Sequence, residues 1–383
     1  MACSSPNRSL PCRRLAGFSL VELMVAVMIG IIASIVIFQV YGVFEGQKRT
    51  TTSAGDAQQN GLAALLYLER DARMAGYGIN GYMPLLGCTV NAYDATGARS
   101  FTFPLAAVQI TKGASTSVPD TITFEYGSSS QRVYQSKLTQ ANASGQTFNK
   151  IDSSFGYLVG DLIILGQAGQ PCTMRQVTAV PGTFDEVDHA AGARYNNAAG
   201  PPVYSGWDNT AQSGGLIFNL GSTLAGNAQP VVATYSVANS QLSYWNQIQA
   251  SVGSAIVEGI VHLRAQYGLD ANGDGFIQSS EWQDGCPTAS QLPVGAGSPP
   301  ACIAPAASDW AKILAIRIAV VARSVQPEKP DPVTGNCTTT TTSPTWTGGT
   351  LDLNLSAVPD NMCYRYRVFE TSVAVRNFIW LPL

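Results

Sequence analysis

The chain begins with a short polar segment that leads into a long apolar run. Residues 1–17 contain three arginines and no acidic residue, and Leu23 to Phe44 form 22 residues without a charge. As a helix this run is roughly 33 Å long, about the thickness of a bilayer core. The pattern predicts a transmembrane helix over residues 18–45, with its basic N-terminal flank in the cytoplasm by the positive-inside rule.

Beyond Glu45 the sequence turns polar and then becomes amphipathic. The stretch LAALLYLERDARMAG places charged residues at positions 69, 70, 71 and 73 beside an apolar stripe with helical spacing. The stripe consists of Leu62, Leu65, Leu66, Leu68 and Ala72. We therefore expect one long helix whose second half, residues 46–76, lays this stripe on a globular domain. The helix could be loosened at Gly55 and Gly61 and should end near Gly76.

Residues 77–383 alternate short β-type runs with clusters of turn residues. Two runs near the end, KILAIRIAVVARS and YRVFETSVAVRN, follow a two-residue period typical of strands with one buried face, and we expect them to pair antiparallel. The Thr-rich stretch between them is predicted to be a surface loop held by Cys337. The predicted fold class is α+β, with a long helix packed on a large antiparallel β-rich domain.

Composition narrows the classes of protein to consider. Only 12% of the residues are charged and the net charge is −3, with no run of basic residues beyond Arg13 and Arg14. This balance is typical of exported β-rich proteins and argues against nucleic-acid binding as the main task.

The eight cysteines form no CxxC pair, so a thiolate metal site is not indicated. If Cys3 and Cys12 are removed with a leader, six remain, which suits three disulfides in an oxidising compartment. Six cysteines allow fifteen pairings. We favour neighbours in sequence, and free buried thiols are the alternative. The favoured pairs are Cys88 with Cys172, Cys286 with Cys302, and Cys337 with Cys363.

The residues at the start of the apolar run form a specific pattern. Gly17-Phe18-Ser19-Leu20-Val21-Glu22 is followed directly by the uncharged helix. The pattern resembles the class III signal of type IV pilins and pseudopilins. The resemblance implies a pilin-like fold, a leader over residues 1–17, cleavage by a prepilin peptidase between Gly17 and Phe18, and methylation of the new Phe18 amine.

Glu22 also has a physical interpretation. An ionisable group inside a membrane helix is costly, so it normally faces a partner or an aqueous path. In a filament built from bundled helices, the natural partner is the N-terminal amine of a neighbouring subunit. Alternatively, Glu22 reaches the lipid headgroups and has no assembly role.

Later stretches resemble the PilW family of large minor pilins, in YLERDARMAGYGING, VHLRAQYGLDANGDG, ILAIRIAVVARS and YRYRVFETSVAVRN. The resemblance implies a single-pass inner-membrane protein with a periplasmic domain, which primes and enters a type IV pilus near its tip and supports adhesion and twitching motility. The implied partners are other minor pilins, the major pilin, the prepilin peptidase, the inner-membrane assembly platform and a tip adhesin.

An acidic loop, DANGDGFIQSSE, matches the spacing of a twelve-residue calcium loop. A hard cation requires several oxygen ligands, and glycine at the sixth position allows the sharp turn. The preceding residues keep a two-residue period, so the loop should follow a strand instead of a helix. An ordinary turn that hydrogen bonds to its own backbone is the alternative. The candidate calcium ligands are Asp270, Asn272, Asp274, Phe276 through its carbonyl, Gln278 and Glu281.

Catalytic chemistry is poorly supported. The two histidines, His189 and His262, lie in unrelated stretches and are predicted to be surface or edge residues, and no GxSxG, HExxH or P-loop occurs. We therefore expect a structural subunit and not an enzyme. The alternatives are a pseudopilin of type II secretion and a membrane-anchored periplasmic adhesin or enzyme.

Overall fold

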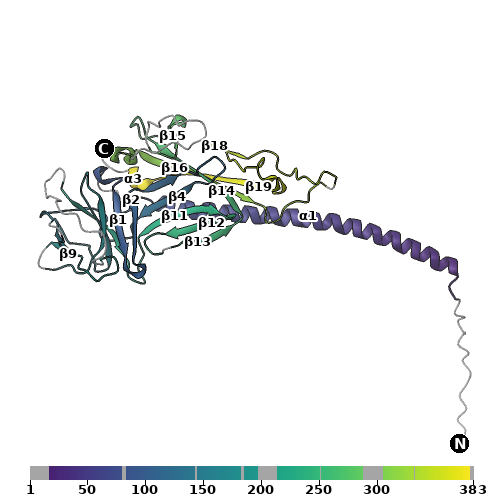
Figure 1. The fold of residues 1–383 in the computed structure, drawn as a ribbon, viewed down its shortest axis with the longest axis horizontal. Helices are drawn as coiled ribbons and strands as arrows, with labels where there is room; N and C mark the ends of the chain where they lie inside the picture. The colour runs from purple at the N-terminus through teal and green to yellow at the C-terminus, as the bar shows by residue number, and fades with distance from the viewer. Residues whose placement is uncertain are drawn as a thin grey trace, which may run out of the picture. The chain divides into compact units, whose positions relative to one another are not determined.

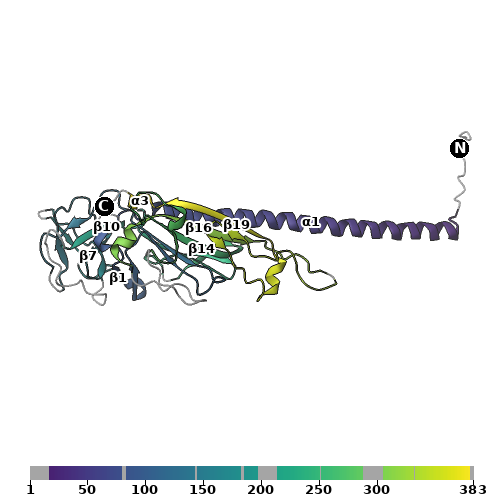
Figure 2. The same ribbon diagram turned by 90° about the horizontal axis from the view of Figure 1, so that it is seen from above.

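The computed structural model describes residues 17–79, 83–142, 145–182, 185–196, 214–250, 252–287, 305–331 and 333–379. The chain divides between Thr52 and Ser53 into two compact units. The second unit contains the strands and the disulfides described below (Figures 1 and 2).

Helix α1 (Leu20–Met74) is a single element of 55 residues, as predicted (Figure 1). It runs through Gly55 and Gly61 without a break. Among the described residues, it is the one helix that is long and apolar enough to cross a membrane. The chain leaves the helix at Gly76, whose φ of +84° lies in the left-handed region that glycine adopts without strain.

The buried face of α1 differs from the predicted stripe. Leu62 and Leu66 are 52% and 68% exposed, whereas the residues that face the core are mostly small. At Gly61 the space that a side chain would need is filled by the ring of Phe369. Small residues occupy this face because the close packing leaves no room for larger side chains. The buried apolar and glycine positions are Ala57, Gly61, Ala64, Leu68 and Ala72, with Ala75 directly after the helix; Ser53 and Asp71 are the buried polar ones.

The first sheet, within the described residues, has the strand order β2-β1-β8-β7-β10-β5. Strands β1 and β8 are parallel, and the other neighbours are antiparallel. The apolar strand β7 is buried on both faces, which explains its continuous run of hydrophobic residues. The bounds are β1 Thr89–Asp94, β2 Arg99–Pro104, β5 Ser136–Lys137, β7 Asp161–Gly166, β8 Cys172–Gln176 and β10 Leu216–Ser222.

The second sheet has the order β13-β12-β11-β4-β3, and all its neighbours are antiparallel. Its strands are β3 Val108–Thr111, β4 Thr121–Tyr126, β11 Val231–Ala238, β12 Gln241–Asn246 and β13 Ser254–Glu258. Two separate pairs of short strands lie outside the larger sheets. They are β6 Phe148–Lys150 with β9 Glu186–Asp188, and β17 Thr345–Trp346 with β18 Gly349–Thr350.

The third sheet has the order β15-β14-β16-β19, and its strands β14, β16 and β19 are labelled in Figure 2. The predicted antiparallel pairing of the two C-terminal runs is confirmed, with Val320 opposite Phe369. Together with α1, the three sheets confirm the predicted α+β class. The strand bounds are β14 Ile260–Leu269, β15 Trp282–Asp284, β16 Ile313–Arg323 and β19 Tyr366–Ala374. The short helices are α2 Ala307–Ala311 and α3 Arg376–Ile379. The 3-10 turns are η1 Met83–Leu85, η2 Ala95–Gly97, η3 Ser279–Glu281 and η4 Pro359–Cys363.

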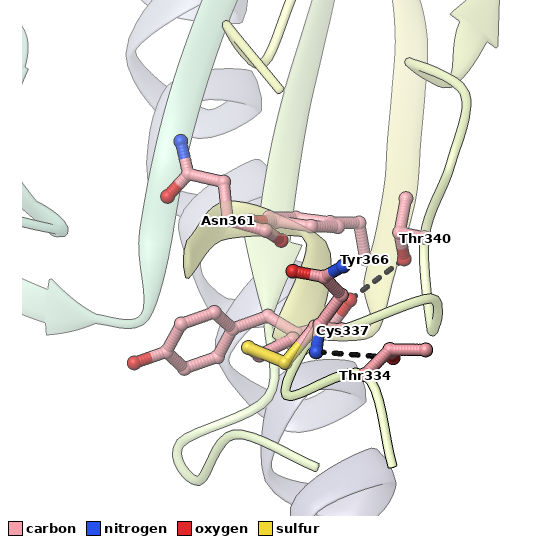
Figure 3. The surroundings of a disulfide bond; sticks show 8 residues. Thr334, Cys337, Thr340, Asn361 and Tyr366 are labelled. Atoms are coloured by element: carbon pink, nitrogen blue, oxygen red, sulfur yellow. Dashed lines mark hydrogen bonds between the residues drawn. A yellow bond between two sulfur atoms is a disulfide. The ribbon is translucent and has the colours of Figure 1, made fainter. Parts of the chain in front are cut away.

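The expectation of one buried face was wrong for the second half of β16. There Ala319 and Val321, on the face away from the main core, are also buried. They are covered by Leu351, Leu353 and Leu355. These leucines belong to residues 337–363, which we call the strap because the Cys337–Cys363 disulfide closes it (Figure 3). The Thr-rich start of the strap is largely exposed, as predicted. It is followed by the β17–β18 hairpin in the middle of the strap.

Candidate functional site

The residues of the predicted processing signal lie at the start of α1. Gly17 has no other atom within 4 Å of its potential Cβ position, and Phe18 is 86% exposed, so both flank an accessible peptide bond. Helix α1 begins two residues later, at Leu20. The geometry is thus open at the position where the signal predicts cleavage.

Glu22 is bound to the backbone of its own chain. Its Oε2 accepts a hydrogen bond from the amide of Ser19 at 3.3 Å, and the Ser19 hydroxyl accepts one from the amide of Glu22 at 3.1 Å. This reciprocal pair is a capping box, which satisfies amides that a helix start leaves free. A carboxylate in the first turn also interacts favourably with the helix dipole.

The capping role of Glu22 was missed from the sequence, although a signal was present. Ser19-Leu20-Val21-Glu22 is a Ser-x-x-Glu motif before an apolar run, the sequence signature of a capping box. The same carboxylate therefore has a local role in the isolated chain, in addition to any role in an assembly.

A second carboxylate of α1 lies inside the globular unit. Asp71 has no exposed surface and accepts hydrogen bonds from the Tyr235 hydroxyl at 2.7 Å and the Tyr126 hydroxyl at 3.1 Å. The Arg70 Nε also donates to it, at 2.9 Å. Since Tyr126 ends β4 and Tyr235 lies in β11, Asp71 fastens the helix to two neighbouring strands of the second sheet.

The tyrosines around Asp71 respond to this burial. Burial and the nearby Asp71 carboxylate raise the pKa of both Tyr235 and Tyr126 above the ordinary tyrosine value. Both hydroxyls therefore stay protonated at neutral pH and remain donors. The sequence placed Asp71 beside the apolar stripe, and nothing local indicated that it would be buried.

The acidic loop follows strand β14, as predicted, and is folded on its own backbone. Asp270 accepts hydrogen bonds from the amides of residues 273, 274 and 275. Asp274 accepts from the amide of Phe276 at 2.8 Å, and this bond, with a second from Asn272, lowers the pKa of the Asp274 carboxyl. Gly273 and Gly275 both have φ near +78° on the left-handed side, so the turn depends on them.

Glu281, at the far end of the loop, also bonds to the backbone. Its oxygens accept from the amides of Ala271, at 3.2 Å, and Gln278, at 2.8 Å. The oxygen-only ligand set suits a hard cation. However, no three Asp, Glu, His or Cys side chains in the described part of the chain are grouped closely enough to hold a metal. The arrangement seen is the self-bonded turn.

The structure contains two of the favoured disulfides. Cys88 is bonded to Cys172, with 5.8 Å between the Cα atoms, and Cys337 to Cys363, with 4.8 Å. The first joins the start of β1 to β8, and the second closes the strap, where the Thr340 hydroxyl also bonds the carbonyl of Tyr364 (Figure 3). The third predicted pair involves Cys302, which lies outside the described residues.

The prediction that both histidines lie on the surface was wrong. His189 and His262 are 3% and 1% exposed. His189 is hydrogen bonded to Asn149 at 2.7 Å, and burial, with the Arg175 charge, lowers its pKa to about 4. His262 contacts the carbonyl of Thr116 at 3.1 Å. Their partners are 40 and 146 residues away in the chain, so the local sequence gave no sign of them.

Comparison with known proteins finds a family match for the C-terminal part of the chain. Residues 226–377 match the family model described as PilW, Type IV Pilus-assembly protein W. No curated protein and no solved structure matches the chain in the corresponding comparisons. The matched range contains the acidic loop, all four strands of the third sheet and the strap. Over residues 226–377 the chain is thus similar to the PilW family of type IV pilus-assembly proteins.

Proposed function

We propose that the chain is a prepilin that is cut after Gly17 and enters a type IV pilus as a minor, non-catalytic subunit. Before assembly it is held in the inner membrane by the first half of α1, with its N-terminus in the cytoplasm and its β domain in the periplasm. Its partners are other minor pilins and the major pilin. We further propose that the subunit lies near the pilus tip, where it primes pilus assembly and supports adhesion.

The observation that carries the proposal is the apolar start of α1. Its side chains have no partner among the described residues, with Phe38 76% and Ile37 65% exposed, so they require lipid or other helices. The similarity of residues 226–377 to the PilW family favours a pilus as the assembly that receives them. It also favours the pilus over the type II secretion apparatus, the alternative predicted from the same signal.

In this proposal Glu22 has successive roles. In the precursor it caps the helix through Ser19. Cleavage after Gly17 creates a positively charged amine on Phe18, and in the assembled filament Glu22 pairs with the Phe18 amine of a neighbouring subunit. Such a pair offsets the cost of burying either charge alone.

The two roles of Glu22 can be separated by substitution. Glu22→Gln keeps a side-chain carbonyl that can accept from the Ser19 amide, because Gln also occurs in capping boxes, but it removes the charge. Ser19→Ala removes the other half of the capping box and leaves the charge. We expect Glu22→Gln to be lost from sheared pili and Ser19→Ala to be largely retained, with methylated Phe18 as the mature N-terminus by mass spectrometry.

Glu45→Ala is the matched control, since Glu45 is an exposed carboxylate of the same helix. It should enter pili like the wild type. Normal incorporation of Glu22→Gln would contradict the ion-pair mechanism, and an unprocessed N-terminus in pili would contradict the whole proposal.

We also propose that the acidic loop binds calcium through the side chains of Asp270, Asn272, Asp274, Gln278 and Glu281 and the carbonyl of Phe276. The support is the oxygen-only ligand set on a turn that already gathers Asp270, Asn272 and Asp274 by hydrogen bonds.

The calcium test is a melting curve of the full chain in micelles with calcium or with a chelator. Calcium should raise the melting temperature of the wild type, because a ligand that binds only the folded state stabilises it. The increase should vanish in Asp274→Ala and persist in Asp331→Ala, an exposed Asp that caps a different turn. Equal melting with calcium and chelator in the wild type would refute calcium binding.

A further inference from the structure

A cavity of about 240 Å³ opens between the strap and the third sheet. Its lining comes from two sources. Strand β16 gives Arg317 and strand β19 gives Glu370, Thr371 and Ser372, while the strap gives Trp346 and Thr347. The strap hairpin is held on the sheet here, because the amide and hydroxyl of Thr347 donate to Glu370 at 2.9 and 2.8 Å.

The strand register places Arg317 in a row of polar side chains that crosses the sheet. Asp284, Gln266, Arg317 and Ser372 lie opposite one another on four adjacent strands and form a polar row across the sheet. Within this row the Nε of Arg317 donates to the side-chain oxygen of Gln266. The Arg317 side chain is thereby fixed in orientation on the sheet surface.

Apart from Trp282, the next row on this face of the sheet contains only glycine and alanine. Trp282, Gly268, Ala315 and Ala374 lie opposite one another on the same four strands. The indole of Trp282 lies over Gly268, where an added Cβ would be 3.1 Å from the ring. The small residues allow Trp282 to lie flat beside Arg317.

Arg317 contacts two aromatic rings. Its guanidinium carbon is 4.7 Å from the centre of the Trp282 ring and 5.5 Å from that of Trp346. No carboxylate lies within salt-bridge distance of Arg317 in the described part of the chain. Cation–π contacts and one hydrogen bond therefore hold the group and leave donors for a ligand.

The charge balance of the cavity favours a neutral ligand. Glu370 lines the same cavity as Arg317, and Asp284 lies on the same row. Burial lowers the pKa of Arg317, while these two carboxylates act in the opposite direction. An anion would gain from Arg317 but would be repelled by Glu370. A hydroxyl group can use both, since it donates to a carboxylate and accepts from a guanidinium.

We propose that this cavity binds one neutral sugar ring, with Arg317 and Glu370 bonding its hydroxyls and Trp346 contacting its apolar face. The cavity is smaller than a typical drug-sized site, which limits the ligand to about one ring. The proposal does not depend on entry of the chain into a pilus.

The test is saturation-transfer NMR with the full chain in dodecylphosphocholine micelles, a detergent without a sugar headgroup. The probes are methyl α-glucopyranoside, methyl β-galactopyranoside and glucuronate. We expect ring-proton saturation for at least one neutral glycoside. Arg317→Lys, which keeps the charge but loses the planar fork, and Glu370→Gln should each weaken binding at least tenfold.

Arg323→Lys is the matched control, because Arg323 lies on the same strand and its guanidinium carbon is 4.1 Å from the centre of the Tyr364 ring, outside the cavity. It should bind like the wild type. Glu370 is exposed, so Glu370→Gln keeps the test valid if Arg317→Lys fails to fold. No saturation of either neutral glycoside by the wild type, unchanged binding by Glu370→Gln, or tighter binding of glucuronate would each overturn the proposal.

Discussion

The two compact units of the chain differ in what they expose and what they bury. In the first, α1 exposes large apolar side chains, such as Met28 at 68% and Phe38 at 76%. The second buries polar groups, and two of its buried carboxylates have partners from the same chain. Asp71 is bonded by two tyrosines, and Asp120 by Arg264 and Lys112.

The contrast shows that residue size along one helix indicates its surroundings. In the first unit α1 carries Ile, Val, Met and Phe, whose large apolar side chains are exposed. In the second unit its buried face is mainly Ala and Gly, together with Leu68, and meets the sheets of its own chain. Within the described residues, α1 thus leaves its large apolar side chains uncovered in the first unit, whereas the second unit covers the small-residue face of the helix with its own residues.

The largest expected effect is that of Asp71→Ala. It leaves the hydroxyls of Tyr126 and Tyr235 buried without their acceptor, and each such group costs about 1–3 kcal/mol. We expect a loss of about 3–4 kcal/mol in the free energy of unfolding, measured by urea denaturation in micelles. Glu69→Ala, which breaks the surface pair with Arg73, should cost less than about 0.5 kcal/mol. Equal losses would mean that Asp71 does not anchor the helix.

Long periodic segments were predictable from the sequence. The uncharged run and its basic flank predicted α1, and the two-residue period predicted β16, β19 and their pairing. The capping box of Ser19 and Glu22 was also predictable from its Ser-x-x-Glu spacing, because it is local, but it was missed. These features depend on residues that are close in sequence or on patterns long enough to be unambiguous.

Features that depend on distant contacts were not predictable. The choice of Ala64 over Leu66 for the buried face of α1 is made by the sheet surface, including the ring of Phe369 over Gly61. The second buried face of β16 exists because the strap leucines fold back over it. The cavity at Arg317 is lined by β16, β19 and the strap, which no local pattern brings together.

Acidification should weaken the second unit, which contains both histidines. The pKa of His189 is about 4 in the folded chain, below the ordinary 6.5, so the unfolded chain binds a proton that the folded chain does not. Its contribution is complete above pH 7 and is lost as the pH falls toward 4. We expect His189 to lower the free energy of unfolding by about 2 kcal/mol between pH 7 and pH 4.5.

The pH effect is measured as the difference between the wild type and His189→Gln, whose amide can still donate to Asn149. Other carboxylates titrate equally in both proteins and cancel. An identical pH dependence in the two proteins would show that His189 is not buried in its neutral form.

A smaller effect is expected from Gly61→Ala. The added methyl group meets the ring of Phe369, and overpacking of this kind costs typically about 1–3 kcal/mol, of which the better helix propensity of alanine returns up to about 1 kcal/mol. The net loss should be about 1 kcal/mol by urea denaturation. Gly55→Ala, with nothing within 4 Å, should be neutral or slightly stabilising. A loss at Gly55 equal to that at Gly61 would place the effect in the helix itself and not in its packing.

The smallest effect on folding is expected from Leu66→Gln. The sequence pattern places Leu66 in the buried stripe, where truncation would cost about 2–5 kcal/mol. In the structure Leu66 is 68% exposed, so the free energy of unfolding should change by less than about 0.5 kcal/mol. Leu68→Gln, two positions on and fully buried, is the contrast and should cost several times more. If the two variants lost equal stability, the helix would present the leucine stripe to the sheet, and the division into an outward and an inward face would be wrong.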